Sequence, residues 1–265
     1  MKKVGIIGCG WLGFRIAKIL SEKFLIYTTT TTTEGSERLR AAGYHPTVVN
    51  FSDHQLPGQS SKWELIDDID ALIITIPISE KNCDASSLYN RIQNLASFIG
   101  DFKGQMFLMN STGVYPDAEK EYSEEDLSID NVSGERMMKN RYQQVNILRL
   151  AGLMGDGRLL SKYNVSNLDA VVNHVHYLDI AAIIMKMMEL GLEGKLYNVV
   201  APLHPTKAAV INAQKNIPYS EEGLPEGRRI SSAKLISELG FVFKYPDPRY
   251  FHLTDGFEPG AGGNK

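Results

Sequence analysis

The fold of this chain is decided by the stretch Lys3-Val4-Gly5-Ile6-Ile7-Gly8-Cys9-Gly10-Trp11-Leu12-Gly13. Its apolar first half is typical of a buried strand, and the apolar spacing after the glycines predicts a helix. In such a strand, turn and helix, Gly8 permits the tight turn, Gly10 lets a phosphate approach the backbone, and Gly13 lets the helix pack on the strand. The N–H groups at the start of the helix then favour an anion.

Further short apolar runs alternate with helical patterns along the chain. The predicted strands are Lys3–Ile7, Phe24–Thr29, Thr47–Phe51, Ala71–Pro77, Gln105–Met109 and Asn146–Leu150. The predicted helices are residues 11 to about 22, Glu34–Ala42, Leu88–Phe98 and Ile180–Leu190. Because these strands are apolar on both faces and are separated by helix-length segments, we predict an α/β fold with a doubly wound parallel sheet, the Rossmann fold.

The domain organisation follows from where this pattern ends. We predict a dinucleotide-binding domain over residues 1–150, to which residues 174–200 return, and a small substrate-side region over residues 151–255. Residues 256–265 lack side chains that pack, and we expect a flexible tail.

The composition excludes several classes of partner. A net charge of −3 gives no basic field for nucleic acid, and the longest apolar run, Ala71–Ile78, is far shorter than the about 20 residues that cross a bilayer. Met1-Lys2-Lys3 leads into a strand without a signal-peptide pattern, and two cysteines imply no disulfide framework. We therefore expect a cytoplasmic protein that binds neither nucleic acid nor membrane; an oligomer is compatible with the sequence.

The glycine turn predicts a dinucleotide cofactor; a tight turn in an α/β protein that binds something else is the alternative. The predicted contacts are Gly8, Cys9, Gly10, Trp11, Leu12, Gly13, Thr28, Thr29, Asn50, Ile76 and Pro77. An NAD enzyme carries an acid after the second strand, where this chain has six threonines, Thr28 to Thr33. Threonine hydroxyls, together with Arg15, Arg38 or Arg40, suit a 2′-phosphate, so NADP is slightly favoured over NAD.

Later motifs resemble the extended short-chain dehydrogenase/reductases, the NAD-dependent epimerase/dehydratase family. Ser111-Thr112-Gly113-Val114-Tyr115-Pro116 is similar to that family's Ser-x-x-Val-Tyr-Gly segment, Arg149 to Arg158 to its loop after the sixth strand, and His176 to Asp179 to its His-x-x-Asp segment. The glycine spacing instead resembles an atypical branch of the superfamily. The resemblance covers nearly the whole chain.

The family's Tyr-x-x-x-Lys pair is absent, because no tyrosine of this chain has a lysine four residues later. The resemblance places Ser133 and Met137 at the two positions. We interpret Ser133 as a helix cap and Met137 as a core residue. The resemblance implies that Ser111 bonds the substrate oxygen, and Tyr115 is the best nearby phenol to act as an acid.

Two further residues are candidates for substrate contact, namely Arg158 and His176. A solvated surface charge and a packed core ring are the respective alternatives. Asp179 is predicted as a helix N-cap. Because no Cys, Asp or Glu cluster accompanies His174 and His176, we predict no metal site.

The leading functional hypothesis is an NAD(P)-binding oxidoreductase or epimerase/dehydratase-like enzyme that acts on a small carbonyl, hydroxyl or nucleotide-sugar-like substrate. The alternative is a catalytically impaired NAD(P)-binding regulator or scaffold, since the missing pair would carry the proton transfer. A hydroxyacid dehydrogenase of the 6-phosphogluconate type matches the opening strand but would need a long helical second half, which this chain lacks.

Overall fold

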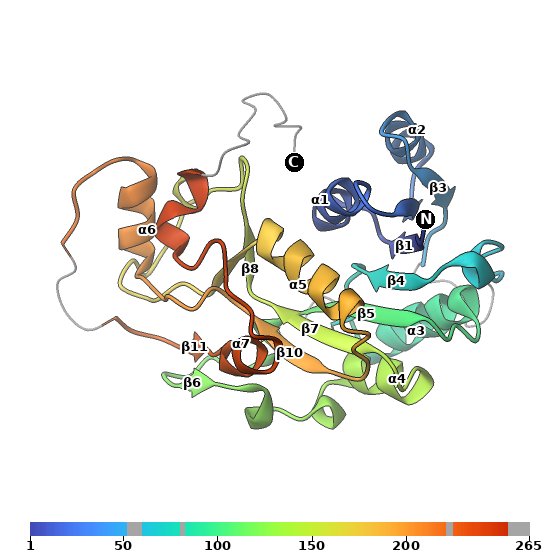
Figure 1. Ribbon diagram of the computed structural model, residues 1–265. Coiled ribbons are helices and arrows are strands. Elements are labelled where there is room, and N and C mark those ends of the chain that lie inside the picture. Colours follow the sequence, from blue (N-terminus) through green and yellow to red (C-terminus); the bar gives the residue numbers. More distant parts are fainter. Residues whose placement is uncertain (52–59, 80–82, 221–224, 254–265) are drawn as a thin grey trace. The chain divides into compact units, whose positions relative to one another are not determined.

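The computed structural model of this chain describes residues 1–51, 60–79, 83–220 and 225–253 (Figure 1). Its strands are β1 (Lys3–Ile7), β2 (Leu25–Thr30), β3 (His45–Val48), β4 (Ala71–Ile74), β5 (Gln105–Ser111), β6 (Glu121–Tyr122), β7 (Asn146–Leu150), β8 (Gly152–Met154), β9 (His174–His176), β10 (Leu196–Val199) and β11 (Arg229–Ile230). Its α-helices are α1 (Trp11–Leu20), α2 (Thr33–Ala41), α3 (Ala85–Ile99), α4 (Ser133–Arg141), α5 (Tyr177–Glu189), α6 (Lys207–Gln214) and α7 (Ala233–Leu239).

Seven strands form one sheet in the order β10-β7-β5-β4-β1-β2-β3. The pairs β1 with β2, β2 with β3, β1 with β4 and β4 with β5 are all parallel. The chain first winds from β1 towards β3 and then continues on the other side of β1 with β4 and β5. The predicted doubly wound α/β fold is confirmed, and its switch point lies between β1 and β4.

The chain divides into two compact units that interleave along the sequence. Unit 1 comprises residues 1–110, 127–148 and 184–196, and unit 2 comprises residues 111–126, 149–183 and the chain from residue 197.

In unit 1, helices cover both faces of the sheet. Figure 1 shows α1 on one face of β1 and β4, with α3 and α4 on the other face of β4 and β5. Side chains along a strand point alternately to the two faces of the sheet. Those on the face covered by α3 and α4 are Ile7, Leu72, Ile74, Met106 and Leu108, and they form one buried cluster with these helices. This core cluster of unit 1 therefore lies beneath the two helices that follow β4 and β5.

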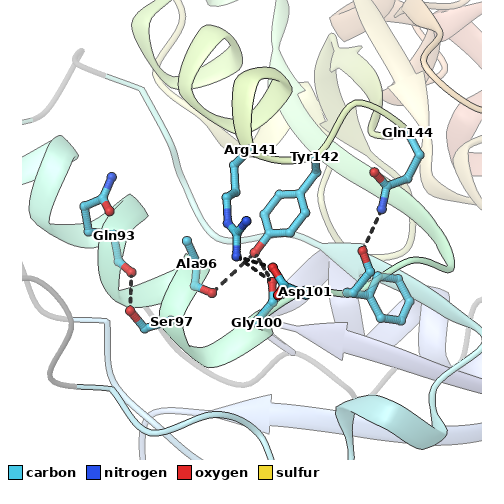
Figure 2. Close-up of polar contacts among 9 residues, drawn as sticks. Gln93, Ala96, Ser97, Gly100, Asp101, Arg141, Tyr142 and Gln144 are labelled. Atoms are coloured by element: carbon cyan, nitrogen blue, oxygen red, sulfur yellow. Dashed lines mark hydrogen bonds and ion pairs between the residues drawn. The ribbon is translucent and has the colours of Figure 1, made fainter.

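The C-terminal ends of α3 and α4 are joined by polar contacts (Figure 2). Arg141 Nη2 donates to the Asp101 carboxylate at 2.6 Å, and the Tyr142 hydroxyl donates to the Gly100 carbonyl at 3.0 Å. Gln144 Nε2 donates to the Phe102 carbonyl at 2.8 Å. The Tyr142 bond satisfies the carbonyl of Gly100, the C-cap residue of α3, and together with the Arg141–Asp101 pair it fixes the end of α4 to the end of α3.

The start of α4 differs from its prediction. Ser133 is the first residue of the helix, the cap position belongs to Val132, and no side chain caps the helix there. The predicted Ser133 cap was therefore wrong, because a short 3-10 turn at Ile129–Asn131 leads the chain into α4 one residue earlier. The core role of Met137 is confirmed, since it packs against the buried cluster of unit 1.

Unit 2 contains two small sheets, β6 with β11 and β8 with β9, and the helices α6 and α7. Asp179 lies inside the first turn of α5, and its carboxylate accepts from the N–H groups of Lys244 at 2.9 Å and Tyr245 at 3.0 Å. The predicted N-cap role of Asp179 was thus wrong; the carboxylate holds a later segment.

The predicted flexible tail, residues 256–265, lies outside the described residues. None of the helices in the described ranges has the length and apolar character needed to cross a bilayer.

Candidate functional site

A pocket of about 520 Å³ opens in unit 1 at the C-terminal ends of β1, β2 and β4. This is the switch point of the sheet, where open α/β proteins bind their ligands. Its lining residues are Gly8, Cys9, Gly10, Thr30, Thr31, Thr32, Glu34, Gly35, Arg38, Thr75, Ile76 and Pro77. Three separate segments thus meet around one cavity.

The three glycines of the first turn have the geometry that a phosphate cradle requires. Gly8 has a φ of +91°, and a Cβ there would lie 2.5 Å from Ile76 Cγ2. A Cβ on Gly13 would lie 2.8 Å from the Gly8 carbonyl oxygen, so α1 packs against the turn only because this side chain is absent. A Cβ on Gly10 would meet no protein atom within 4 Å. Gly10 therefore borders space that a ligand can fill.

Threonines from both neighbouring strands hold this turn. The Gly8 N–H donates to Thr29 Oγ1 at 2.9 Å, and the Cys9 N–H donates to the Thr29 carbonyl at 2.8 Å. On the other side, the Thr75 hydroxyl donates to the carbonyls of Ile7 and Gly8. The shape of the turn is thus set by β2 and β4 as well as by its own glycines.

The start of α2 forms the opposite wall of the pocket. Thr32 caps this helix, because its Oγ1 accepts from the Gly35 N–H at 3.0 Å. Glu34 and Arg38 lie one turn apart on α2 and place one negative and one positive charge at the cavity. Since α1 also begins at this pocket, the positive ends of two helix dipoles favour a ligand with more than one anionic group.

The structure brings together five of the predicted cofactor residues, namely Gly8, Cys9, Gly10, Ile76 and Pro77. The other six do not line the pocket: Trp11, Leu12, Gly13, Thr28, Thr29 and Asn50. Thr28 and Thr29 are buried inside the sheet, and the threonines at the cavity follow directly at Thr30, Thr31 and Thr32.

Of the arginines considered for a 2′-phosphate, only Arg38 lines the pocket. Arg15 instead lies over the Trp11 ring at 4.0 Å and donates to the Trp11 carbonyl at 2.9 Å. Cys9 lines the cavity, but burial raises the pKa of its thiol to about 12, against a smaller opposing effect of the Arg38 charge. The thiol is therefore protonated and unreactive at neutral pH.

Ser111 ends β5 and is exposed. Its Oγ accepts from the Gly113 N–H at 3.0 Å, which leaves the hydroxyl proton available for another oxygen. The preceding residue, Asn110, is buried and donates from Nδ2 to Glu135 Oε1 of α4 at 2.5 Å. The exposed hydroxyl thus follows a strand end that is fixed to a helix.

Tyr115, the other predicted catalytic residue, lies in a different environment. It is buried, and its hydroxyl accepts from Arg149 Nη1 at 2.8 Å and donates to Asn198 Oδ1 at 2.8 Å. Its carbonyl accepts from Arg228 Nη1 at 2.7 Å. Burial raises the pKa of this phenol, against the opposing charge of Arg149. These contacts support a structural role, and the acid role of Tyr115 stays a prediction.

Sequence reasoning missed the residues that surround Tyr115. Glu124 is buried beside them, and its Oε1 accepts from the Asn198 N–H at 2.6 Å. The available signal was the Arg149 charge within a strand predicted to be buried, since a buried charge needs partners.

The predicted substrate residues Arg158 and His176 lie near one turn of unit 2. The backbones of Gly155 and Arg158 bond to each other across this turn, and the His176 ring faces Gly155. His176 is fully buried among Tyr177, Tyr245 and Phe251, and burial lowers the pKa of its imidazole to about 4. Both residues therefore neighbour Gly155, and their substrate role stays a prediction.

Comparison with known proteins agrees with this fold. No protein-family model matches the chain. Protein YeeZ of Escherichia coli strain K12 is 28% identical over 269 residues, which span 94% of this chain and 98% of YeeZ.

Solved structures with the same fold are more distant in sequence. Vestitone reductase from alfalfa superposes with a TM-score of 0.69 at 14% identity, covering 96% of this chain and 97% of the reductase. Yeast methylglyoxal/isovaleraldehyde reductase Gre2, complexed with NADPH, gives 0.68 at 14% identity over 91% of this chain and 94% of its own. The dTDP-glucose 4,6-dehydratase of Bacillus anthracis, in complex with NAD, gives 0.65 at 14% identity over 94% of each chain.

These comparisons define the class to which the fold belongs. The chain shares a Rossmann-like fold with these two reductases and this dehydratase, and this is the fold that its sequence pattern predicted. Among curated sequences it is similar to YeeZ along nearly its whole length.

Proposed function

We propose that this chain binds a nicotinamide dinucleotide in the pocket at the switch point of its sheet. The observation that carries the proposal is the open space beside Gly10, bordered by the N-terminal ends of α1 and α2. The pyrophosphate would lie against the glycine turn, where Gly8 and Gly13 permit the required close packing. Neighbours of this fold that are complexed with NADPH or NAD support the same cofactor class.

Within this class we favour NADP. Arg38 and the threonines Thr30 to Thr32 surround the start of α2, where the adenosine ribose of a bound dinucleotide would lie, and they suit a 2′-phosphate. Glu34 would bind a 2′-hydroxyl and repel a phosphate, but Arg38 one turn away offsets its charge. The affinity for NADPH should therefore exceed that for NADH.

The proposed reaction is an oxidoreduction or epimerisation at a small carbonyl or hydroxyl compound. The bound cofactor would supply hydride transfer. Ser111 would donate its hydroxyl proton to the substrate oxygen, while its Oγ accepts from the Gly113 N–H. This hydrogen bond would orient and polarise the oxygen.

A second function, a cofactor-binding regulator without turnover, is supported by one specific observation. The chain has no Tyr-x-x-x-Lys pair, and the phenol nearest to Ser111 in sequence has its hydroxyl engaged by Arg149 and Asn198. Positioned acid–base catalysis contributes about 10²–10⁴-fold, so its loss would leave a slow enzyme.

The cofactor proposal is tested by fluorescence titration of NADPH and NADH with the wild type and two variants. Gly10→Val places methyl groups in the open space and should weaken both cofactors by at least about 100-fold, while thermal stability changes little because no protein atom is displaced. Arg38→Ala should weaken NADPH by about 10-fold or more and leave NADH unchanged. Unaltered binding to Gly10→Val would refute the pyrophosphate position.

The reaction is tested by a turnover screen with carbonyl compounds and nucleotide sugars. If a substrate is found, Ser111→Ala should lower kcat by about 10-fold or more without altering cofactor affinity. Full activity in Ser111→Ala would exclude its role, and tight NADPH binding with no turnover would favour the regulator.

A further inference from the structure

A two-residue turn in unit 2 joins Gly155 to Arg158. The Gly155 N–H donates to the Arg158 carbonyl at 3.4 Å, and the Arg158 N–H donates to the Gly155 carbonyl at 3.1 Å. The residues between them are Asp156 and Gly157. Asp156 has a φ of +51°, in the left-handed region, whereas the φ of Gly157 is not positive. A positive φ at the first central residue alone is the pattern of a type II′ turn.

An aspartate at the first central position of this turn is unusual. A type II′ turn has glycine there, because a Cβ is strained at positive φ. In this chain the glycine stands one position later, and Asp156 adopts the strained conformation. Two contacts hold it: the Tyr177 hydroxyl donates to Asp156 Oδ1 at 2.8 Å, and Gly155 packs so closely on the Tyr177 ring that a Cβ would lie 2.6 Å from Cδ1. Strain that is maintained in this way is typical of positions with a chemical role.

The conformation of the turn directs the Asp156 side chain towards the next backbone nitrogen. The first central residue of a type II′ turn has a ψ of about −120°. At this angle the Cβ of an L residue lies on the same side of the Cα–C bond as the nitrogen that follows. Rotation about χ1 alone then brings the Asp156 carboxyl carbon to the Gly157 nitrogen, and the five atoms form a ring. The turn thus orients the two reacting groups in advance.

The Gly157 nitrogen is accessible to such an attack. Gly157 is exposed, and its N–H has no hydrogen-bond partner among the described residues. With no side chain, the glycine does not shield its own nitrogen. At the other reacting atom, the hydrogen bond from the Tyr177 hydroxyl draws electron density from the Asp156 carboxyl group, which makes the carbon more electrophilic.

The other two described non-glycine residues with positive φ do not share this arrangement. Asn216, with a φ of +54°, is followed by Ile217, whose N–H donates to the Asn212 carbonyl at 2.9 Å. Asn167, with a φ of +50°, is followed by Leu168. In both cases a branched side chain stands at the nitrogen that would attack. Of these three residues, only Asp156 precedes a glycine.

We propose that Asp156 is a site of spontaneous backbone modification, in which aspartate becomes isoaspartate through a cyclic succinimide. The Gly157 nitrogen attacks the Asp156 carboxyl carbon, an N–C bond forms, and the carboxyl hydroxyl leaves as water with the amide proton. A water molecule then opens the ring at either carbonyl. Opening at the side-chain carbonyl restores aspartate, and opening at the main-chain carbonyl leaves isoaspartate. The reaction needs water alone, and neither residue lines the cofactor pocket.

Isoaspartate changes the turn that holds Arg158. Its main chain runs through the former side chain and is longer by one carbon atom, so the strained φ at position 156 is relieved. The carboxylate that accepts from Tyr177 is displaced, and so are the two backbone bonds between Gly155 and Arg158. The modification therefore slowly alters the surroundings of one predicted substrate residue.

The test incubates the full chain in water enriched in heavy oxygen, at mildly acidic pH, because the leaving hydroxyl requires a protonated carboxyl group. After digestion with trypsin in ordinary water, mass spectrometry measures heavy oxygen in the peptide of residues 150–158, whose only Asp or Asn is Asp156. We expect this peptide to gain heavy oxygen and to separate into an aspartate and an isoaspartate form on chromatography.

Two variants and one peptide serve as controls. Gly157→Val should slow the labelling about 10-fold or more, because a branched side chain shields the nitrogen, and its Cβ meets only Lys162 Nζ at 3.7 Å. Asp156→Glu should give no label, since its longer side chain does not form the five-membered ring. A synthetic peptide of residues 150–158 has the same dipeptide without the folded turn, and it should be labelled about 10-fold more slowly than the full chain.

Three outcomes would overturn the proposal. They are the absence of heavy oxygen in the peptide of residues 150–158, labelling of Gly157→Val at the wild-type rate, and labelling of the full chain no faster than that of the synthetic peptide. The last would assign the reaction to the Asp-Gly sequence alone. Melting temperatures verify that each variant is folded; if Gly157→Val is not, the comparison of full chain and peptide decides. None of these results depends on whether the chain binds NADPH.

Discussion

The hydroxyl of Tyr115 connects three segments of unit 2 by hydrogen bonds. It links Arg149, which lies 34 residues away in sequence, to Asn198, which lies 83 residues away. All three residues are buried, so each hydrogen bond replaces one that water would otherwise make. The segment after Ser111 is thereby anchored at its far end.

Tyr115→Phe should therefore destabilise the protein. The ring still fits, but Arg149 and Asn198 lose the hydroxyl, and the expected loss in the free energy of unfolding is about 3 kcal/mol. Urea denaturation measures it, with Tyr163→Phe as the matched control, since Tyr163 is exposed in unit 2 and should change stability by less than about 0.5 kcal/mol. Unchanged stability in Tyr115→Phe would contradict the structural role.

His176 predicts acid sensitivity. Burial lowers its pKa from 6.5 to about 4, so the folded state resists protonation more than the unfolded chain does. The contribution of His176 is present in full above about pH 6.5 and is lost as the pH falls towards 4, by about 1.4 kcal/mol per pH unit. Burial also lowers the pKa of His174 to about 4, so His174 adds a second loss of the same sign, which remains when His176 is replaced. Urea midpoints between pH 7.5 and pH 4.5 should fall along this course in the wild type. His176→Phe should flatten the fall, and an equal slope in both proteins would disprove this assignment.

At the scale of single elements, close backbone approaches decide where helices can lie. Gly134 is in the first turn of α4, and a Cβ at this position would lie 2.1 Å from the Ile78 carbonyl oxygen. No side chain fits there. The residue after Ser133 is thus constrained to glycine by the chain that follows β4.

Gly134→Ala should displace α4 or the chain at Ile78. We expect a cost of about 1–3 kcal/mol in the free energy of unfolding, as for other overpacked sites. Asn140→Ala, on the exposed side of the same helix, is the matched control and should be neutral within about 0.5 kcal/mol. Circular dichroism with urea compares the two; equal stability would show that α4 is not held at this contact.

Most helices and strands could be predicted from the sequence, because the apolar spacing and the turn residues that define them are local. The strands β1 and β7 were predicted with their observed bounds, and Gly8, Gly10 and Gly13 occupy the expected positions. The ends of the strands were predicted less accurately. Strand β3 ends at Val48, so Asn50 lies beyond it, and β2 extends to Thr30. Because β2 is one residue longer than predicted, the threonines that line the cavity are Thr30, Thr31 and Thr32 and not the predicted Thr28 and Thr29.

Contacts between distant segments were beyond sequence reasoning. The cap predicted at Ser133 failed because the preceding 3-10 turn cannot be recognised from residue types alone. The network around Tyr115 joins three segments whose pairing follows only from the fold. Glu34 at the cavity was missed for a similar reason, since it depends on where α2 begins.

On the scale of the whole molecule, the two units interleave, and a ligand bound to one of them need not stabilise the other equally. NADPH at about 100 times its dissociation constant should add about 2.7 kcal/mol to the free energy of unfolding of the folded unit that binds it.

Differential scanning calorimetry should show a single transition, shifted to higher temperature by NADPH, if the two units unfold together. If only the first of two transitions moves, the units are energetically separate. No shift in the wild type would contradict cofactor binding, and Gly10→Val provides the baseline.

The threonine bonds around Gly8 also have a kinetic consequence. Because Thr29 and Thr75 hold the turn from both sides, its backbone needs no rearrangement when the cofactor arrives, and little ordering entropy is lost on contact. Stopped-flow mixing with NADPH should then give one exponential phase whose rate rises linearly with cofactor concentration, whereas a plateau would reveal a slow opening step. In Thr75→Val, which loses this hydroxyl, we expect such a plateau to appear, so the speed of cofactor capture would depend on a side chain with no other assigned role in the chemistry.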